Sequence, residues 1–141
     1  MSLFSHALVP IANADDAAAT LDSLFPYLDE DAHITVVHVI EKAGGAPDKA
    51  SVEQREEHAE EAFELVRQRC ADAGVDCETR LTYGTDVPET VFDIATEVDA
   101  SAIAFVSRPG NRLIRFLSGD NALDFVTKAN LPVVALPGED E

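Results

Sequence analysis

The sequence predicts a single α/β domain over residues 1–141, with a five-stranded, mainly parallel, doubly wound sheet and helices on both faces. Two observations predict this fold. Short apolar segments, several rich in β-branched residues, alternate with segments whose apolar residues recur at helical spacing. The length of 141 residues suits one domain whose core needs no metal or disulfide. We expect the strand order 3-2-1-4-5, one of the common doubly wound layouts.

The N-terminal segment predicts a strand followed by a helix. His6–Ile11 (HALVPI) is a short apolar run that ends at a cluster of small polar residues, as a buried strand does. Apolar residues then recur at helical spacing from Ala17 to Leu28. Two aspartates precede them, where carboxylates favour the positive end of a helix dipole. We therefore expect a helix that ends between Tyr27 and Asp31.

The middle of the chain predicts a second strand and a long helix. Ile34–Ile40 is nearly continuous and β-branched, so both faces of this strand should be covered. His38 within it is expected to be a satisfied structural residue without chemistry. After a loop-like segment, Ser51 and Gln54 form the pattern of a capping box, which predicts a helix start. Gly74 is expected to end this helix, whose opposite face carries solvated glutamates.

The remaining elements continue the alternation. Asp86 can cap a helix and Pro88 fits its first turn, so a helix is expected to begin there. In the predicted order, the crevice at the carboxyl end of the sheet is walled by the loops after Ile11 and after Ser107. The further strands are predicted at Asp76–Tyr83, Ala102–Val106 and Val133–Leu136, and the last helix at Asp120–Ala129.

The chain is strongly acidic, with 27 Asp and Glu against ten Lys and Arg and a formal charge of −17. Nucleic acid and anionic membranes are therefore poor partners. Few lysines, many carboxylates and small apolar residues favour a halophilic prokaryote, where salt screens the self-repulsion; the alternative is an ordinary acidic protein. The N-terminus lacks a basic segment with a cleavage site, and no apolar run approaches membrane-spanning length. We therefore expect a cytoplasmic protein.

Two cysteines occur, Cys70 and Cys77. Cys70 lies on the apolar face of the long predicted helix, and Cys77 near the start of the following strand. Their C-x6-C spacing matches none of the usual metal or redox motifs. We expect two small core or half-buried residues, with a functional thiol pair as the alternative, and no metal site.

Four stretches resemble the universal stress protein family. They are VPIANADDA after the first strand, VVHVIE on the second, YGTDVPETVFDIA in the third unit, and SRPGNRLIRFLSGDNALDFVTKANLPVVAL at the end. The resemblance covers essentially the whole chain. It implies a cytoplasmic protein that usually dimerises through its last strand, in a family with ATP-binding and non-binding members. The implied homodimer interface comprises Leu131, Val133, Val134, Ala135 and Leu136.

The nucleotide-binding signature of that family is largely missing. Its binders carry G-x2-G-x9-G-[S/T] in the last loop; counting back from Gly119 places Pro109 and Val106 at the two earlier glycines. Asp120 takes the Ser/Thr position, and the first loop, V-P-x-D-G-S in binders, reads VPIANA without the acid. Proline lacks an N–H donor, and a carboxylate competes for N–H groups that a phosphate needs. We expect usual ATP binding to be lost and no cofactor to be required.

Three arginines in the same loop keep a second interpretation open. Arg108, Arg112 and Arg115 lie within eight residues, and guanidinium groups suit phosphate and carboxylate. They could bind an anion, although we favour pairing with neighbouring acids or with the dimer partner. If a nucleotide or another anion binds, the residues expected to contact it are Pro10, Ile11, Ala12, Val39, Arg108, Gly110, Arg112, Gly119, Asp120 and Asn121.

The predicted function is a non-catalytic stress-response or regulatory module that acts through dimerisation and an unidentified protein partner. One alternative is a switch that binds ATP, an AMP-like nucleotide or another anion through the loop from Arg108 to Asn121. The second alternative is a weak phosphoanhydride hydrolase. Catalysis is not expected, because the sequence contains no G-x-S-x-G, P-loop or H-E-x-x-H motif.

Overall fold

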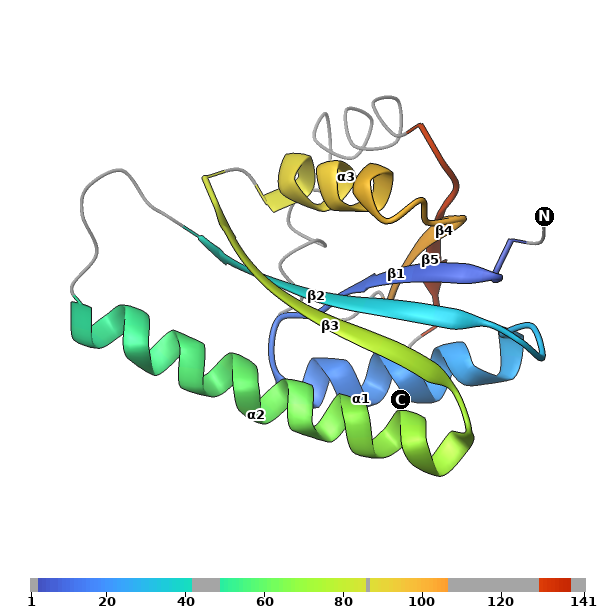
Figure 1. Cartoon of the computed structure of the whole chain (residues 1–141), viewed down its shortest axis with the longest axis horizontal. Coiled ribbons are helices and arrows are strands. Elements are labelled where there is room, and N and C mark those ends of the chain that lie inside the picture. Colours follow the sequence, from blue (N-terminus) through green and yellow to red (C-terminus); the bar gives the residue numbers. More distant parts are fainter. Residues whose placement is uncertain (1–2, 42–48, 86, 107–129, 138–141) are drawn as a thin grey trace.

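The computed structural model describes residues 3–41, 49–85, 87–106 and 130–137. Within them a parallel sheet is covered by α1 and α2 on one face and by α3 on the other (Figure 1). The elements are β1 (His6–Pro10), α1 (Ala14–Leu24), a 3-10 helix (Phe25–Tyr27), β2 (His33–Glu41), α2 (Lys49–Ala73), β3 (Asp76–Gly84), α3 (Val87–Glu97), β4 (Ala102–Val106) and β5 (Val133–Leu136).

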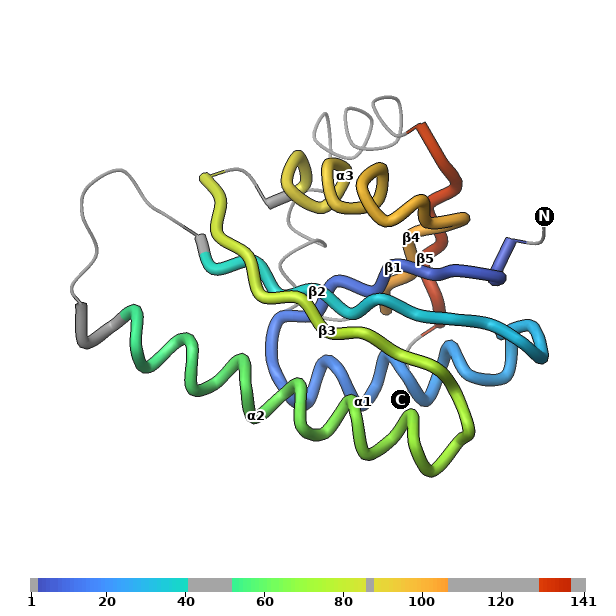
Figure 2. Tube along the Cα trace, viewed as in Figure 1, coloured from blue at the N-terminus to red at the C-terminus, as the bar shows by residue number. Residues whose placement is uncertain are grey.

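The sheet has five strands in the order β3-β2-β1-β4-β5, and every neighbouring pair is parallel. This confirms the predicted fold class and strand order. The chain first adds strands on one side of β1 and then returns to add β4 and β5 on the other, as the trace in Figure 2 shows. The order therefore reverses between β1 and β4, which is where parallel α/β proteins form their crevice.

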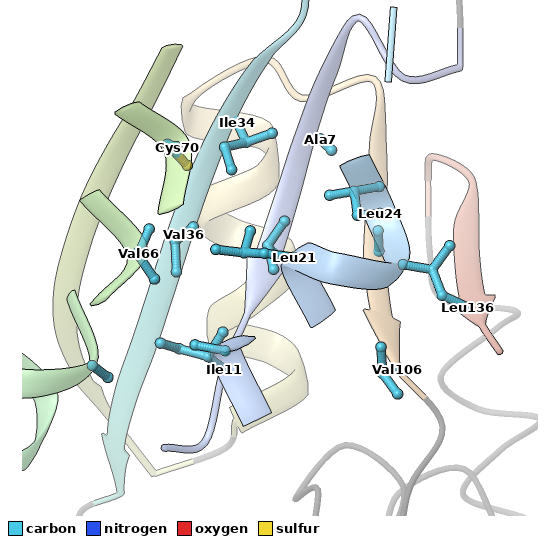
Figure 3. Packing of buried hydrophobic residues seen from close by; sticks show 14 of the residues in the cluster. Ala7, Ile11, Leu21, Leu24, Ile34, Val36, Val66, Cys70, Val106 and Leu136 are labelled. Carbon is cyan, nitrogen blue, oxygen red and sulfur yellow. The ribbon is translucent and has the colours of Figure 1, made fainter. Parts of the chain in front are cut away.

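Two apolar clusters hold the layers together. On one face, alternate residues of β1 and β2 meet α1 and α2; Figure 3 shows Leu21, Ile34 and Val36 in this layer. On the other face, Leu8 and Val37 meet Val91 of α3. Residues of opposite parity on one strand thus enter opposite clusters, which is why the strands read as continuous apolar runs.

Two predicted helix boundaries differ from the structure. The first helix ends at Leu24 and continues as a 3-10 turn over Phe25–Tyr27, because Pro26 lacks the N–H that a further α-helical turn requires. The predicted start at Ser51 is wrong: α2 begins at Lys49, so Ser51 lies inside the helix. Lys49 and Ala50 are good helix formers, and the helix extends through them.

Two glycines hold positions that other residues would strain. Gly74 follows α2 with φ of 72°, which confirms the predicted helix end in the left-handed region. At the end of β3, a Cβ on Gly84 would collide with the Thr90 side chain of α3. Gly84 therefore permits the close approach of α3 to the sheet.

The strand boundaries lie within one residue of expectation: β1 ends at Pro10 and not at Ile11, and β2 extends one residue beyond Ile34–Ile40 at each end. β4 and β5 have the predicted limits, β3 is one residue longer, and Pro88 lies in the first turn of α3. The predicted cap Asp86 and the predicted last helix, Asp120–Ala129, lie outside the described residues. Among the helices described, none has both the length and the apolar character needed to cross a membrane.

Candidate functional site

The candidate site lies where the central strand β1 ends and α1 begins. Val106, at the carboxyl end of neighbouring β4, is buried beside this switch point. Residues Ile11–Asn13 form the link from β1 to α1, which we call the first loop. The second expected wall, including Arg108, Gly110, Arg112, Gly119, Asp120 and Asn121, lies outside the described residues. Of the two expected walls of the crevice, the first loop is the one whose geometry the structure describes.

Hydrogen bonds to β2 and to α1 hold the backbone of the first loop in place. The Ile11 N–H donates to the Val37 carbonyl at 2.9 Å, and the Ala12 N–H donates to Asp16 Oδ2 at 2.8 Å. In return, the Asp16 N–H donates to Asn13 Oδ1 at 2.8 Å, so Asn13 caps α1. Asp16 is only 4% exposed. Its carboxylate thus points back to the loop backbone and is covered.

His38 of β2 fixes the same loop from the side. Its Nδ1 lies 2.9 Å from the Ile11 carbonyl oxygen. Because a carbonyl oxygen only accepts, Nδ1 carries the hydrogen of this bond. Both backbone polar groups of Ile11 are therefore engaged with β2. The bond agrees with the structural role predicted for His38.

The described residues among the predicted contacts divide between core and surface. Pro10 and Ile11 are buried at the end of β1, with Ala12 partly exposed beyond them. Ile11 packs in the cluster under α1 and α2, whereas Val39 is 6% exposed in the cluster under α3. Ile11 and Val39 therefore pack on opposite faces of the sheet. Ala12 is the one of these four residues that is not buried.

Asn13, Asp16 and His38 shape the loop but were not among the predicted site residues. For the first two a sequence signal existed: Asn13 and Asp16 have the spacing of an N-cap and its N3 partner. No local signal indicates the contact of His38, because it joins residues on different strands. It depends on the register that pairs Pro10 with Val37.

A second polar group lies at the opposite end of the same strand. His6 Nε2 is 2.8 Å from Thr35 Oγ1, and the His6 and His33 rings meet edge to face with centroids 4.7 Å apart. His33 Nε2 lies 3.9 Å from Glu78 Oε1. We call His6, His33, Thr35 and Glu78 the amino-end cluster. No metal-holding group of His, Cys, Asp or Glu occurs among the described residues.

The protonation of His6 is shifted by its surroundings. Burial lowers the pKa of His6, and the nearby His33 ring lowers it further. The carboxylates of Glu78 and Asp99 act in the opposite direction without reversing the shift. The neutral form of His6 is therefore favoured in the folded protein.

The two cysteines are free thiols in the predicted environments. Cys70 is 1% exposed in the core, and Cys77 is half-buried and packs against the same cluster. Burial raises the pKa of the Cys70 thiol to about 12, and the neighbouring Cys77 thiol adds to this shift. The fold thus brings together two residues whose sequence spacing matched no known motif.

The predicted dimer residues lie on the edge strand β5 and just before it. In the described sheet β5 pairs with β4 alone, so its other edge is not covered by a described strand. Leu136 is 3% exposed and Ala135 is exposed, while Leu131, Val133 and Val134 are half-buried against the two core clusters. Most of these side chains therefore already contribute to the core of one chain.

Comparison with known proteins agrees with this architecture. The model of the universal stress protein family matches residues 4–137. No curated protein matches the chain. A solved universal stress protein family member from Burkholderia pseudomallei is 22% identical, with a TM-score of 0.75 over 98% of this chain and 99% of that one.

Two further solved structures carry nucleotides. The universal stress protein from Archaeoglobus fulgidus in complex with dAMP is 25% identical, with a TM-score of 0.64 over 96% of this chain and 99% of that one. A universal stress protein family protein from Arabidopsis thaliana with AMP bound is 17% identical, with a TM-score of 0.66 over 96% and 92%. Since the family model spans every described helix and strand, this chain belongs to the universal stress protein family.

Proposed function

We propose that this chain is a cytoplasmic, non-catalytic regulatory member of its family that acts through dimerisation and a protein partner, without usual ATP binding. The closed first loop carries the proposal. A nucleotide at the switch point needs backbone donors or an acid turned toward the crevice. Here the Ala12 N–H is bonded to Asp16, and the Asp16 carboxylate is covered.

The sequence of the other loop supports the same proposal. Pro109 supplies no N–H, and Asp120 stands where binders carry a hydroxyl residue. A carboxylate about 4 Å from a phosphate would repel it by on the order of 4 kcal/mol at an effective dielectric near 20. That repulsion exceeds the net gain from several ordinary hydrogen bonds.

A reconstitution experiment tests this proposal. We expect no binding of the wild-type chain to ATP with magnesium in equilibrium dialysis. The variant Ala12→Asp/Pro109→Gly/Asp120→Ser restores the acid, one glycine and the hydroxyl, and is expected to gain binding. Ala12→Asp alone serves as the matched control and should remain without binding. Stoichiometric ATP binding by the wild type would refute the proposal.

A nucleotide-responsive switch remains a second candidate function. The relatives from Archaeoglobus fulgidus and Arabidopsis thaliana, with dAMP and AMP respectively, favour it, as do the three arginines that follow β4 in the sequence. Titration with AMP, dAMP and inorganic phosphate tests it. Binding of AMP or dAMP that is lost in Arg108→Gln/Arg112→Gln would support the switch, and absence of binding for all three probes would exclude it.

The proposed dimer is supported by the position of β5 at the edge of the described sheet, where no described strand pairs with its outer side. Unpaired N–H and C=O groups at a sheet edge favour pairing with a second copy. Ala135 is exposed on this strand, so Ala135→Arg should shift the protein to monomer in light scattering. Gln68→Arg, at an exposed position of α2, serves as the control and should not. A monomeric wild type at micromolar concentration would contradict the dimer.

The acidic surface supports the proposed halophilic origin. Glu57, Glu60, Glu61 and Glu64 line one stretch of α2, and Arg67 pairs with Glu60 at 3.0 Å and Glu64 at 3.2 Å. Uncompensated like charges at this spacing each cost about 0.2–0.5 kcal/mol at low salt. We expect the far-UV circular dichroism to weaken on dialysis from molar to millimolar salt; an unchanged spectrum would argue for an ordinary acidic protein.

A further inference from the structure

We propose that Cys70 and Cys77 form a reversible intramolecular disulfide that joins the last turn of α2 to the start of β3. The two residues come from different elements that pack against each other. Cys70 is buried on the sheet-facing side of α2, in the layer that Figure 3 shows with Ile34 and Val36. Cys77 lies on β3 and is paired in register with Ile34 of β2.

The turn between the two elements brings the thiols to the same layer. The Val75 N–H donates to the Cys70 carbonyl at 2.9 Å, and the Gly74 N–H donates to Ala71 at 3.2 Å. With Gly74 at φ of 72°, these bonds reverse the chain directly after α2. β3 then begins at Asp76, so Cys77 is its second residue. Because Ile34 and Cys77 both pack in the cluster of Cys70, the thiols share one side of the sheet.

Exposure sets the order of the chemistry. Cys77 is half-buried, whereas Cys70 is 1% exposed and burial raises the pKa of its thiol to about 12. A small disulfide oxidant therefore reaches Cys77 first. Cys70 is then the resolving thiol, shielded from the oxidant and packed in the same cluster as Cys77.

The reaction balances with a low-molecular-weight disulfide, RSSR, as the oxidant. The Cys77 thiolate attacks one sulfur of RSSR, the S–S bond breaks, and RS⁻ leaves a mixed disulfide on Cys77. The Cys70 sulfur then attacks Cys77 Sγ, forms the new S–S bond and expels the second RS⁻. The Cys70 proton and the proton that Cys77 lost on forming its thiolate pass to the two released RS⁻. The protein loses two electrons and two protons, and RSSR becomes two RSH.

Oxidised glutathione is a suitable probe of this reaction on the full chain. We expect the wild type to lose the mass of two hydrogen atoms and to become resistant to alkylation at both cysteines. Dithiothreitol should reverse both changes. Cys77→Ser, which changes only the half-buried thiol, should form no disulfide and no adduct under the same conditions.

A shifted dithiol provides the matched control. In Cys77→Ser/Thr79→Cys the second thiol stays on the same face of β3 but moves about 6.6 Å along the strand, beyond the span of a disulfide. Thr79 Oγ1 lies 3.3 Å from Arg67 Nη2, one helical turn before Cys70. We expect at least about tenfold less intramolecular disulfide in this variant at equal oxidation time, with the mixed disulfide accumulating instead.

Three outcomes would overturn the proposal. The first is a stable glutathione adduct on wild-type Cys77 that Cys70 does not resolve. The second is cross-linking between chains in place of an internal bond. The third is an equal yield in the shifted dithiol, which would show that position on β3 does not matter. Circular dichroism of each reduced variant verifies that it is folded.

Discussion

The two ends of β1 use polar residues in different ways. At the carboxyl end, Asn13 and Asp16 bond to backbone groups only a few residues away, and His38 bonds to the Ile11 carbonyl. At the amino end, His6 contacts the side chains of Thr35 and His33 on β2, and Glu78 of β3 lies beside His33. The polar side chains at the carboxyl end bond to backbone groups, whereas those at the amino end contact one another and include titratable groups. We therefore expect the conformation of the first loop to depend on hydrogen-bond geometry, and the stability of the amino end to depend on proton binding.

The largest expected effect comes from opening the carboxyl end. Asp16→Ala removes the acceptor of the Ala12 N–H and should lower the free energy of unfolding by about 2 kcal/mol, since hydrogen bonds to charged groups contribute roughly 1.5–3 kcal/mol. Urea denaturation at fixed molar salt measures this. Asp16→Asn retains an oxygen and should lose less than half as much. Equal losses in the two variants would show that charge, and not the bond, matters here.

A smaller loss is expected from the helix cap in the same loop. Asn13→Ala removes the side-chain oxygen that accepts the Asp16 N–H and should cost about 1 kcal/mol, a typical value for an N-cap. The same denaturation experiment applies. Asn13→Ser, which keeps a capping oxygen, should lie close to the wild type; if it loses as much as alanine, the cap is not the source of stability.

At the amino end, the expected effect is a dependence on pH. The pKa of His6 is lowered in the folded protein by burial and by His33, so the unfolded chain binds the proton more readily. Above a pH of about 6.5, His6 is neutral in both states and does not lower the free energy of unfolding. Below that pH the unfolded chain binds the proton first, so the free energy of unfolding falls until the pH reaches the lower pKa of the folded state. In urea melts, the His6→Gln variant should show a flatter profile from pH 7.5 to 5. A parallel profile would remove His6 as the cause.

The smallest effect is expected from Glu78 in the same cluster. Its carboxylate is 46% exposed and 3.9 Å from His33, so its pairing contributes little by itself. Glu78 opposes the lowering of the pKa of His6, and Glu78→Gln should therefore lower that pKa further. NMR titration of the His6 ring measures the change. A rise in the pKa of His6 in this variant would contradict the assigned role of Glu78.

Local patterns predicted elements well where they were apolar and bounded. Ala102–Val106 and Val133–Leu136 have the expected limits because each is a short apolar run next to polar or proline residues. The capping-box pattern at Ser51 failed, because favourable residues upstream allowed the helix to begin at Lys49. Local sequence patterns therefore predict the bounds of a short apolar strand more accurately than the first residue of a polar helix.

The sequence by itself determined the alternation of strands and helices, the strand order and the family resemblance. It also showed the missing glycines and acid of the nucleotide signature, because each of these is a property of single positions or short patterns. Only the tertiary structure decided that the Asp16 side chain is buried, that His6 meets His33, and that Cys70 and Cys77 share one layer. The last two contacts join different elements. They depend on strand register and on which face each side chain takes, and a shift of one residue would send the side chain to the other face.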